Sequence, residues 1–139
     1  MIILDTNVVS EPMRPSGSPA VRAWLDRQVA ETLYLTATGL SELMLGIEVL
    51  PSGRRRDELR AGLAELLDTL FESRILPFDA AAAHAFARLS AQARSAGRAI
   101  AMADGQIAAI AAVHGFRVAT RDRAPFEAAG VPVIDPWAA

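Results

Sequence analysis

Short apolar runs alternate with longer helix-like segments along this chain. The runs that are rich in β-prone residues cover 2–4, 33–35, 75–78, 116–119 and 131–134. Their apolar residues are nearly continuous, which is typical of strands that are covered on both faces of a parallel sheet. The pattern therefore predicts buried parallel strands.

The segments between these runs carry helix start and stop signals. Ser18–Pro19 places a capping side chain before a proline at the first helical position. Asp79 precedes a run of alanines and is suited to cap a helix that ends near Gly97. Asp104 stands at the start of a further helix, which Gly115 ends.

This alternation of strands and helices predicts an α/β fold. We expect a single domain over residues 1–139, with a central, mainly parallel sheet of about five strands flanked by helices on both faces. In such a sheet the carboxyl ends of the strands line one edge, where ligands bind. Asp5 follows the first strand and is therefore expected in that edge crevice.

The composition fits a protein with a substantial core. Hydrophobic residues make up 52% of the chain and charged residues 22%. No apolar run reaches the roughly 18 residues that a transmembrane helix needs, so we expect no membrane association. The first residues lack a basic segment followed by a long apolar stretch, and cysteine is absent. We therefore expect no secretory signal, no disulfide and a cytoplasmic location.

The charged residues exclude some kinds of chemistry. All 14 basic residues are arginine, which excludes a P-loop lysine, a Schiff base and a lysine general base. The net charge of −2 lacks the basic excess of a protein that coats nucleic acid, so contact with a polyanion requires a local basic patch. Arg54–Arg56 is the only basic run. It begins a helix, where positive charge is unfavourable. These arginines are therefore either a solvated helix start or a contact for RNA phosphate or a partner.

Four acids occupy positions at which chemistry is expected: Asp5, Glu42, Asp104 and Asp122. Asp5 and Asp122 follow predicted strands, and Asp104 begins a helix, so these three are expected at the same sheet edge. Each has a local alternative, because Asp5 and Asp104 can act as helix caps and Asp122 can occupy a turn.

Glu42 lies within a predicted helix and is expected to be partly buried. Leu40, Leu43, Met44 and Ile47 form the apolar stripe of that helix, and Glu42 shares its side with Thr38, Leu45 and Gly46. A buried charge without a partner is costly. Arg121 is one candidate partner, and a bound cation is another.

Several carboxylates in one crevice repel one another and raise each other's pKa values. A hard divalent cation relieves this repulsion, because Mg²⁺ and Mn²⁺ take oxygen ligands and commonly link carboxylates to a substrate phosphate. Such ions activate water and stabilise a leaving oxygen. The acids therefore indicate a site for metal-dependent hydrolysis of phosphodiesters.

The sequence resembles the PIN-domain ribonucleases, and in particular the VapC-type toxins of bacterial toxin–antitoxin pairs, including the FitB-like branch. Four stretches carry the resemblance in order along essentially the whole chain: IILDTNVVSE, SELMLGIE, GRAIAMADGQIAAIA and VATRDRAPFEAAGVPVIDPW. The resemblance implies that the four acids bind Mg²⁺ or Mn²⁺ and carry the catalysis.

The resemblance also assigns supporting residues. It implies that Thr6, Asn7 and Thr120 support the acids by hydrogen bonding, and we expect Arg121 and Arg123 at the crevice rim as phosphate contacts or as salt-bridge partners. Many family members carry a further acid shortly after the third one, whereas Gly105 and Gln106 follow Asp104 here. The sequence therefore does not decide whether the site binds one metal ion or two.

The implied function is an endoribonuclease toxin, with RNA as substrate. The resemblance implies inhibition by a cognate antitoxin, a homodimer, and contact with operator DNA only through the antitoxin. The alternative is a non-catalytic α/β regulatory or binding module whose acidic pocket holds a structural ion. Receiver domains need a lysine at such a site, and aspartyl-phosphate hydrolases need an acid at the position of Asn7, so two rival classes lack a required residue.

Overall fold

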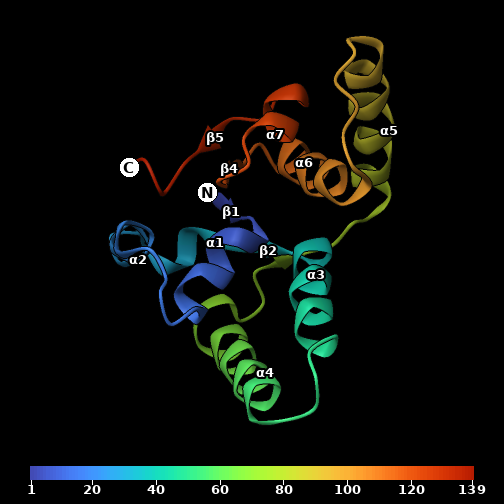
Figure 1. Ribbon diagram of the computed structural model, residues 1–139. Coiled ribbons are helices and arrows are strands. Elements are labelled where there is room, and N and C mark those ends of the chain that lie inside the picture. The colour runs from blue at the N-terminus through green and yellow to red at the C-terminus, as the bar shows by residue number, and fades with distance from the viewer.

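The computed structural model describes all of residues 1–139. Its twelve main elements alternate between strands and helices, as the apolar runs predict (Figure 1). In chain order they are β1 (Ile2–Leu4), α1 (Thr6–Ser10), α2 (Pro19–Asp26), β2 (Leu33–Thr36), α3 (Ala37–Glu48), α4 (Arg54–Leu66), β3 (Ile75–Leu76), α5 (Ala80–Ser95), α6 (Met102–His114), β4 (Arg117–Ala119), α7 (Ala124–Ala128) and β5 (Val133–Ile134).

The five strands form one parallel sheet in the order β3-β2-β1-β4-β5. Strand β1 lies in the centre, with Ile3 paired to Tyr34 of β2 on one side and to Val118 of β4 on the other. The predicted α/β class with five parallel strands is therefore confirmed. The chain passes from β1 to β2 on one side, and β4 adds on the other side, so β1 and β4 form a topological switch point.

Helices cover both faces of the sheet, and each face has its own core (Figure 1). One face packs against α1 to α4, with Trp24, Leu43 and Phe71 among its buried side chains. The opposite face packs against α5, α6 and α7 and includes Ile107 and Phe126. None of the helices combines the length and the apolar content needed to cross a membrane.

The helix starts that the capping residues predict agree with the structure for α2 and α5 but not fully for α6. Ser18 caps α2 and Asp79 caps α5, since each side chain accepts a hydrogen bond from a backbone N–H of the first turn. Helix α6 begins at Met102, with Ala101 as its cap residue, so Asp104 lies inside the first turn. Asp104 therefore lies at the helix start as predicted, but the alternative that it acts only as the cap is wrong, because Ala101 holds that position and two helical residues precede Asp104.

Close packing of α5 against α6 fixes the position of the acid on α6. The two helices share an extensive contact surface, and Gly105 lies within it. A Cβ atom at Gly105 would lie 2.8 Å from Cε2 of Phe86, closer than side chains approach one another. Glycine therefore lets α5 pack tightly beside the residue that follows Asp104.

Candidate active site

The ends of β1 and β4 hold two of the predicted acids side by side. Asp5 directly follows β1, and its backbone N–H donates to Ala119 O in β4 at 3.0 Å. Asp122 follows β4 in the loop before α7. Both therefore lie at the switch point, where parallel sheets form their ligand crevice.

Asp5 is buried and held by several hydrogen bonds. Its Oδ1 accepts from the backbone N–H of Thr6 at 2.8 Å, so Asp5 does cap α1. Its Oδ2 accepts from the hydroxyl of Thr120 at 2.8 Å and from Nδ2 of Asn7 at 3.5 Å. Capping and site formation are thus two functions of one carboxylate, and the local alternative does not compete with the chemical one.

Thr120 and Asn7 tie the loop after β4 to the end of β1. The hydroxyl oxygen of Thr120 accepts from the backbone N–H of Asp122 at 3.0 Å and from Nδ2 of Asn7 at 3.3 Å. Oδ1 of Asn7 accepts from the backbone N–H of Arg121 at 3.3 Å. These bonds fix where the Asp122 backbone lies relative to Asp5.

Helices α3 and α6 carry the other two acids. Glu42 lies in the middle of α3 and Asp104 in the first turn of α6. The two helices are joined by a hydrogen bond in which the hydroxyl of Thr38 donates to Oε1 of Gln106 at 2.9 Å. Each partner of this bond lies near one acid, Thr38 one turn before Glu42 and Gln106 two residues after Asp104.

The acids influence one another electrostatically. Burial raises the pKa of Asp5 above its ordinary value, and the charge of Asp122 raises it further, while hydrogen bonds from Thr120 and Thr6 oppose the rise. Desolvation, followed by the charges of Asp5 and Asp122, raises the pKa of Asp104.

Glu42 belongs to the same electrostatic cluster. Its pKa is raised by partial desolvation and then by the charges of Asp5 and Asp104. The structure therefore brings Asp5, Glu42, Asp104 and Asp122 close enough for their charges to interact.

Glu42 and Arg121 differ from their predicted environments. Glu42 is exposed as a residue rather than partly buried, although its carboxylate is partly desolvated. Met44 of the predicted apolar stripe is also 47% exposed. Arg121 is no partner for Glu42, since its guanidinium lies 5.2 Å from the centre of the Trp137 ring. Arg123 pairs with Glu127 at 2.9 Å, as the salt-bridge interpretation expects.

The donor set fits a hard divalent cation. All four side chains offer carboxylate oxygens, and none of them takes part in an ion pair with arginine. No group of three or more acidic or histidine side chains is arranged to enclose a metal ion directly. Mg²⁺ commonly keeps several waters and takes only one or two protein carboxylates, so this open arrangement suits it.

Sequence reasoning did not identify the Thr38–Gln106 bond. Gln106 follows Asp104 at a position where many family members carry an acid, which does not point to a bond with another helix. Its amide stands in an apolar segment, IAMADGQIAAIAA, and an isolated polar residue among alanines and isoleucines is the signal that could have indicated a partner on another helix.

Comparison with known proteins agrees with this geometry. Residues 2–131 match the family described as PIN domain. The chain is 50% identical to the VapC ribonuclease Y4jK of Sinorhizobium fredii, covering 99% of this chain and 98% of the relative. It is 46% identical to toxin FitB of Neisseria gonorrhoeae, covering 99% of both chains.

A solved structure shares the fold over nearly its full length. The structure of FitAB bound to an IR36 DNA fragment superposes with a TM-score of 0.94 at 44% identity, covering 99% of this chain and 96% of that chain. The matched sequences, the parallel sheet and the acids at its switch point lead to one conclusion: this chain belongs to the PIN-domain family, in the branch that contains the VapC ribonuclease and toxin FitB relatives.

Proposed function

We propose that this protein is a metal-dependent endoribonuclease and the toxin of a toxin–antitoxin pair. The observation that supports the proposal is the position of Asp5 and Asp122 at the ends of neighbouring strands, where Thr120 ties them together. Glu42 and Asp104 lie on helices near enough for their charges to act on Asp5 and on each other, and no arginine pairs with any of the four. The PIN-domain match and the VapC ribonuclease relative support a nuclease, and RNA is the substrate that the latter's name indicates.

Asp5 and Asp104 are the proposed principal ligands of Mg²⁺ or Mn²⁺. Glu42 and Asp122 complete the acidic pocket, directly or through water molecules. When bound, the ion supplies the charge that lowers the pKa of a water and neutralises the phosphate. With an ion bound, the carboxylates of Glu42 and Asp122 would accept hydrogen bonds from a water and so orient it.

The supporting residues hold these carboxylates in position. Thr120 and Asn7 donate to Oδ2 of Asp5 and so fix the rotamer of that side chain, and the Thr120 bond opposes the rise in the Asp5 pKa that burial causes. The Thr6 backbone N–H fixes Oδ1. Because Arg123 is paired with Glu127, Arg121 is the better candidate of the two for contact with substrate phosphate.

The proposed partners of the protein rest on its membership of the PIN-domain family. We propose that residues 1–139 act as one nuclease domain in a cytoplasmic homodimer, inhibited by a cognate antitoxin that alone contacts operator DNA. The relative named toxin FitB and the FitAB–DNA structure support the antitoxin partner.

Asp5→Asn tests the proposal. We expect the wild-type protein to cleave single-stranded RNA with Mn²⁺ and to stop when EDTA is added, and we expect Asp5→Asn to reduce cleavage at least ~1,000-fold while the fold is kept. Asp79→Asn is the matched control, because Asp79 also caps a helix and lies outside the crevice. Equal cleavage by wild type and Asp5→Asn would contradict the proposal, and Mn²⁺ binding without any cleavage would favour the non-catalytic alternative.

A further inference from the structure

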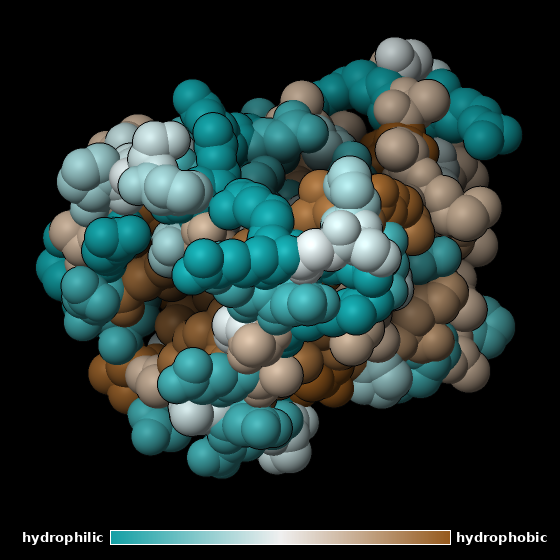
Figure 2. Space-filling view, turned by 60° about the horizontal axis from the view of Figure 1, so that its bottom comes forward, coloured by the Kyte–Doolittle hydropathy of each residue, from teal (hydrophilic) through white to brown (hydrophobic).

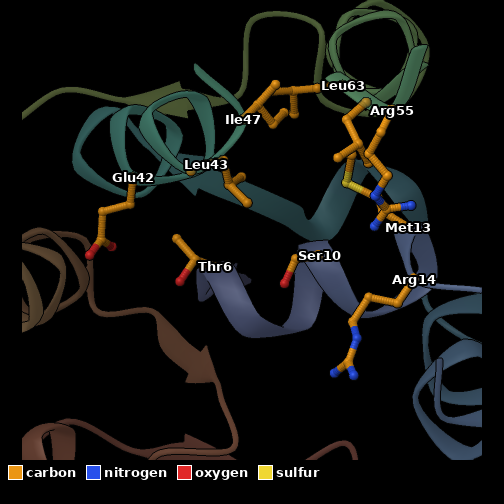
Figure 3. Close-up of a pocket in the computed structure, with 11 residues that line it drawn as sticks. Thr6, Ser10, Met13, Arg14, Glu42, Leu43, Ile47, Arg55 and Leu63 are labelled. Carbon is orange, nitrogen blue, oxygen red and sulfur yellow. The ribbon is translucent and has the colours of Figure 1, made fainter. Parts of the chain in front are cut away.

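A groove leads away from the acids between α1, α3 and α4 (Figure 3). It has a volume of about 300 Å³. Glu42 and Thr6 stand at one end, and Figure 3 shows Arg14 and Arg55 at the other. Because Glu42 belongs to the acidic cluster, the groove adjoins the candidate active site at this end.

Three arginines gather where the groove opens away from the acids. Arg14, Arg22 and Arg55 line an adjoining hollow of about 410 Å³, and we call them the arginine patch. Hydrophilic and apolar side chains are interspersed on the face that Figure 2 turns forward. In a chain of net charge −2, three converging arginines form the local basic patch that contact with a polyanion requires.

Two of the three arginines in this patch have no acidic partner. Glu58 is the one acid that lines the hollow, and its carboxylate accepts from Nε of Arg54 at 2.8 Å. Arg22 and Arg55 take part in no ion pair, and Arg14 lies 3.6 Å from Glu11.

The three arginines of the basic run Arg54–Arg56 have different surroundings. Arg54 pairs with Glu58, and Arg56 donates to the hydroxyl of Ser52 at 2.8 Å. Only Arg55 faces the groove with a free guanidinium. Arg54 and Arg56 therefore fit the interpretation of a solvated helix start. Arg55 is the one arginine of the run that is free to contact an anion.

We propose that the groove and the arginine patch bind the sugar–phosphate backbone of the RNA strand that is cut at the acids. This inference rests on the proposed function. Four carboxylates repel a polyanion, so the substrate needs cationic contacts beyond the metal site, and arginine binds phosphate through paired N–H donors. Five apolar side chains line the groove, and none of its residues is an aromatic on which bases could stack. The attraction for the strand therefore comes from the arginine patch and is independent of base sequence.

The salt dependence of RNA binding tests this inference. A labelled single-stranded RNA is titrated with Asp5→Asn protein between about 50 and 200 mM salt. Each phosphate contact to a single strand contributes about 0.7 to the slope of log affinity against log salt, so Arg55→Ala is expected to lower that slope by about 0.7, and Arg22→Ala by a similar amount. Arg55 is the cleaner position than Arg14, because Arg14 also lies near Glu11.

Arg117→Ala is the matched control for this experiment. Arg117 is exposed and begins β4, at the sheet edge opposite to the acids, and its substitution changes the net charge equally. In the chain with Asp5 intact, Arg55→Ala should raise KM for RNA several-fold and leave kcat within about twofold, since it contacts no reacting atom.

Each result separates the two proposals. A wild-type protein that cleaves RNA, with slope and KM unchanged by Arg22→Ala and Arg55→Ala, overturns the groove assignment and leaves the nuclease intact. Unchanged RNA binding together with lost inhibition by the co-expressed antitoxin would also overturn it, since the groove would then dock the protein partner. Binding that depends on the patch in a wild-type protein without cleavage would refute only the nuclease.

Discussion

At the scale of single residues, the Thr120 hydroxyl connects two acids. It donates to Oδ2 of Asp5 and accepts from the backbone N–H of Asp122, and it is completely buried. A buried hydroxyl that satisfies several partners is costly to remove, because the groups that it leaves behind lose their hydrogen bonds in a place that water cannot easily reach.

Thr120→Val should therefore both destabilise the protein and weaken its metal site. We expect a loss of about 1–3 kcal/mol in the free energy of unfolding, measured with denaturant. The Asp5 carboxylate also loses the hydrogen bond that holds its rotamer, so calorimetry should show weaker Mn²⁺ binding. Thr120→Ser keeps the hydroxyl and should keep most of the Mn²⁺ affinity. Equal Mn²⁺ affinity in both variants would show that this hydroxyl does not support the site.

The sequence predicted the positions of some site residues better than those of others. Asp5 was placed correctly because an acid that directly follows a buried strand must lie at the sheet edge. Asn7 and Thr120 were expected only through the family resemblance, since their bonds join positions 113 residues apart in the chain. The exposure of Glu42 was predicted wrongly, because a helical pattern does not show which faces another element covers.

At the scale of elements, the hydrogen bond between Thr38 and Gln106 joins the two helices that carry Glu42 and Asp104. The strands were predicted almost residue by residue, because each is a short apolar run between clear turn signals. The start of α6 was missed, since Ala101 caps it without a side-chain hydrogen bond and therefore leaves no sequence signal. The register of α3 against α6 likewise depends on tertiary packing.

Gln106→Ala should loosen this register without unfolding the protein. One lost side-chain hydrogen bond costs about 0.5–1.5 kcal/mol of stability. A shift of the acids relative to each other should lower kcat for RNA by about tenfold, with a smaller change in KM, because poorly positioned groups lose transition-state stabilisation first.

A double-mutant cycle separates positioning from a general loss of stability. Thr38→Val removes the donor of the same bond, so Thr38→Val and Gln106→Ala together should cost no more kcat than either alone. Thr38→Ser retains the donor and should keep kcat close to that of the wild type. Additive losses in the double variant would mean that the two residues act independently, contrary to a shared bond between the helices.

At the scale of the whole molecule, the fold assembles charges that the unfolded chain keeps apart. Four acids spread over more than a hundred residues meet because β1 and β4 are neighbours and because α3 and α6 pack against each other. The sequence indicates that acids after strands share one sheet edge. It does not indicate which strands are neighbours, so it cannot give the distances between the acids. The cost of the assembly is visible in the raised pKa values of Asp5, Glu42 and Asp104.

Metal-free protein should therefore lose stability as the pH rises. A carboxylic acid whose pKa is raised by folding binds a proton more tightly in the folded state, so the free energy of unfolding is highest below the ordinary pKa. For Asp104 it falls as the pH rises from 3.8 through the raised folded value. Asp104→Asn removes this loss, so the metal-free variant should melt at a higher temperature than the wild type near pH 7 and at the same temperature near pH 3.5.

Mn²⁺ should reverse that order. A ligand that binds only the folded state adds about 2.7 kcal/mol of stability at a concentration one hundred times its Kd, and the wild type should gain this while Asp104→Asn gains much less. Melting curves of both proteins at neutral pH, with EDTA and with Mn²⁺, measure the crossing. A metal-free variant that is less stable than the wild type at neutral pH would show that Asp104 is a structural residue. Equal stabilisation of both proteins by Mn²⁺ would place the ion away from Asp104, because a carboxylate that holds the ion in the fold must lose that stabilisation when it becomes an amide.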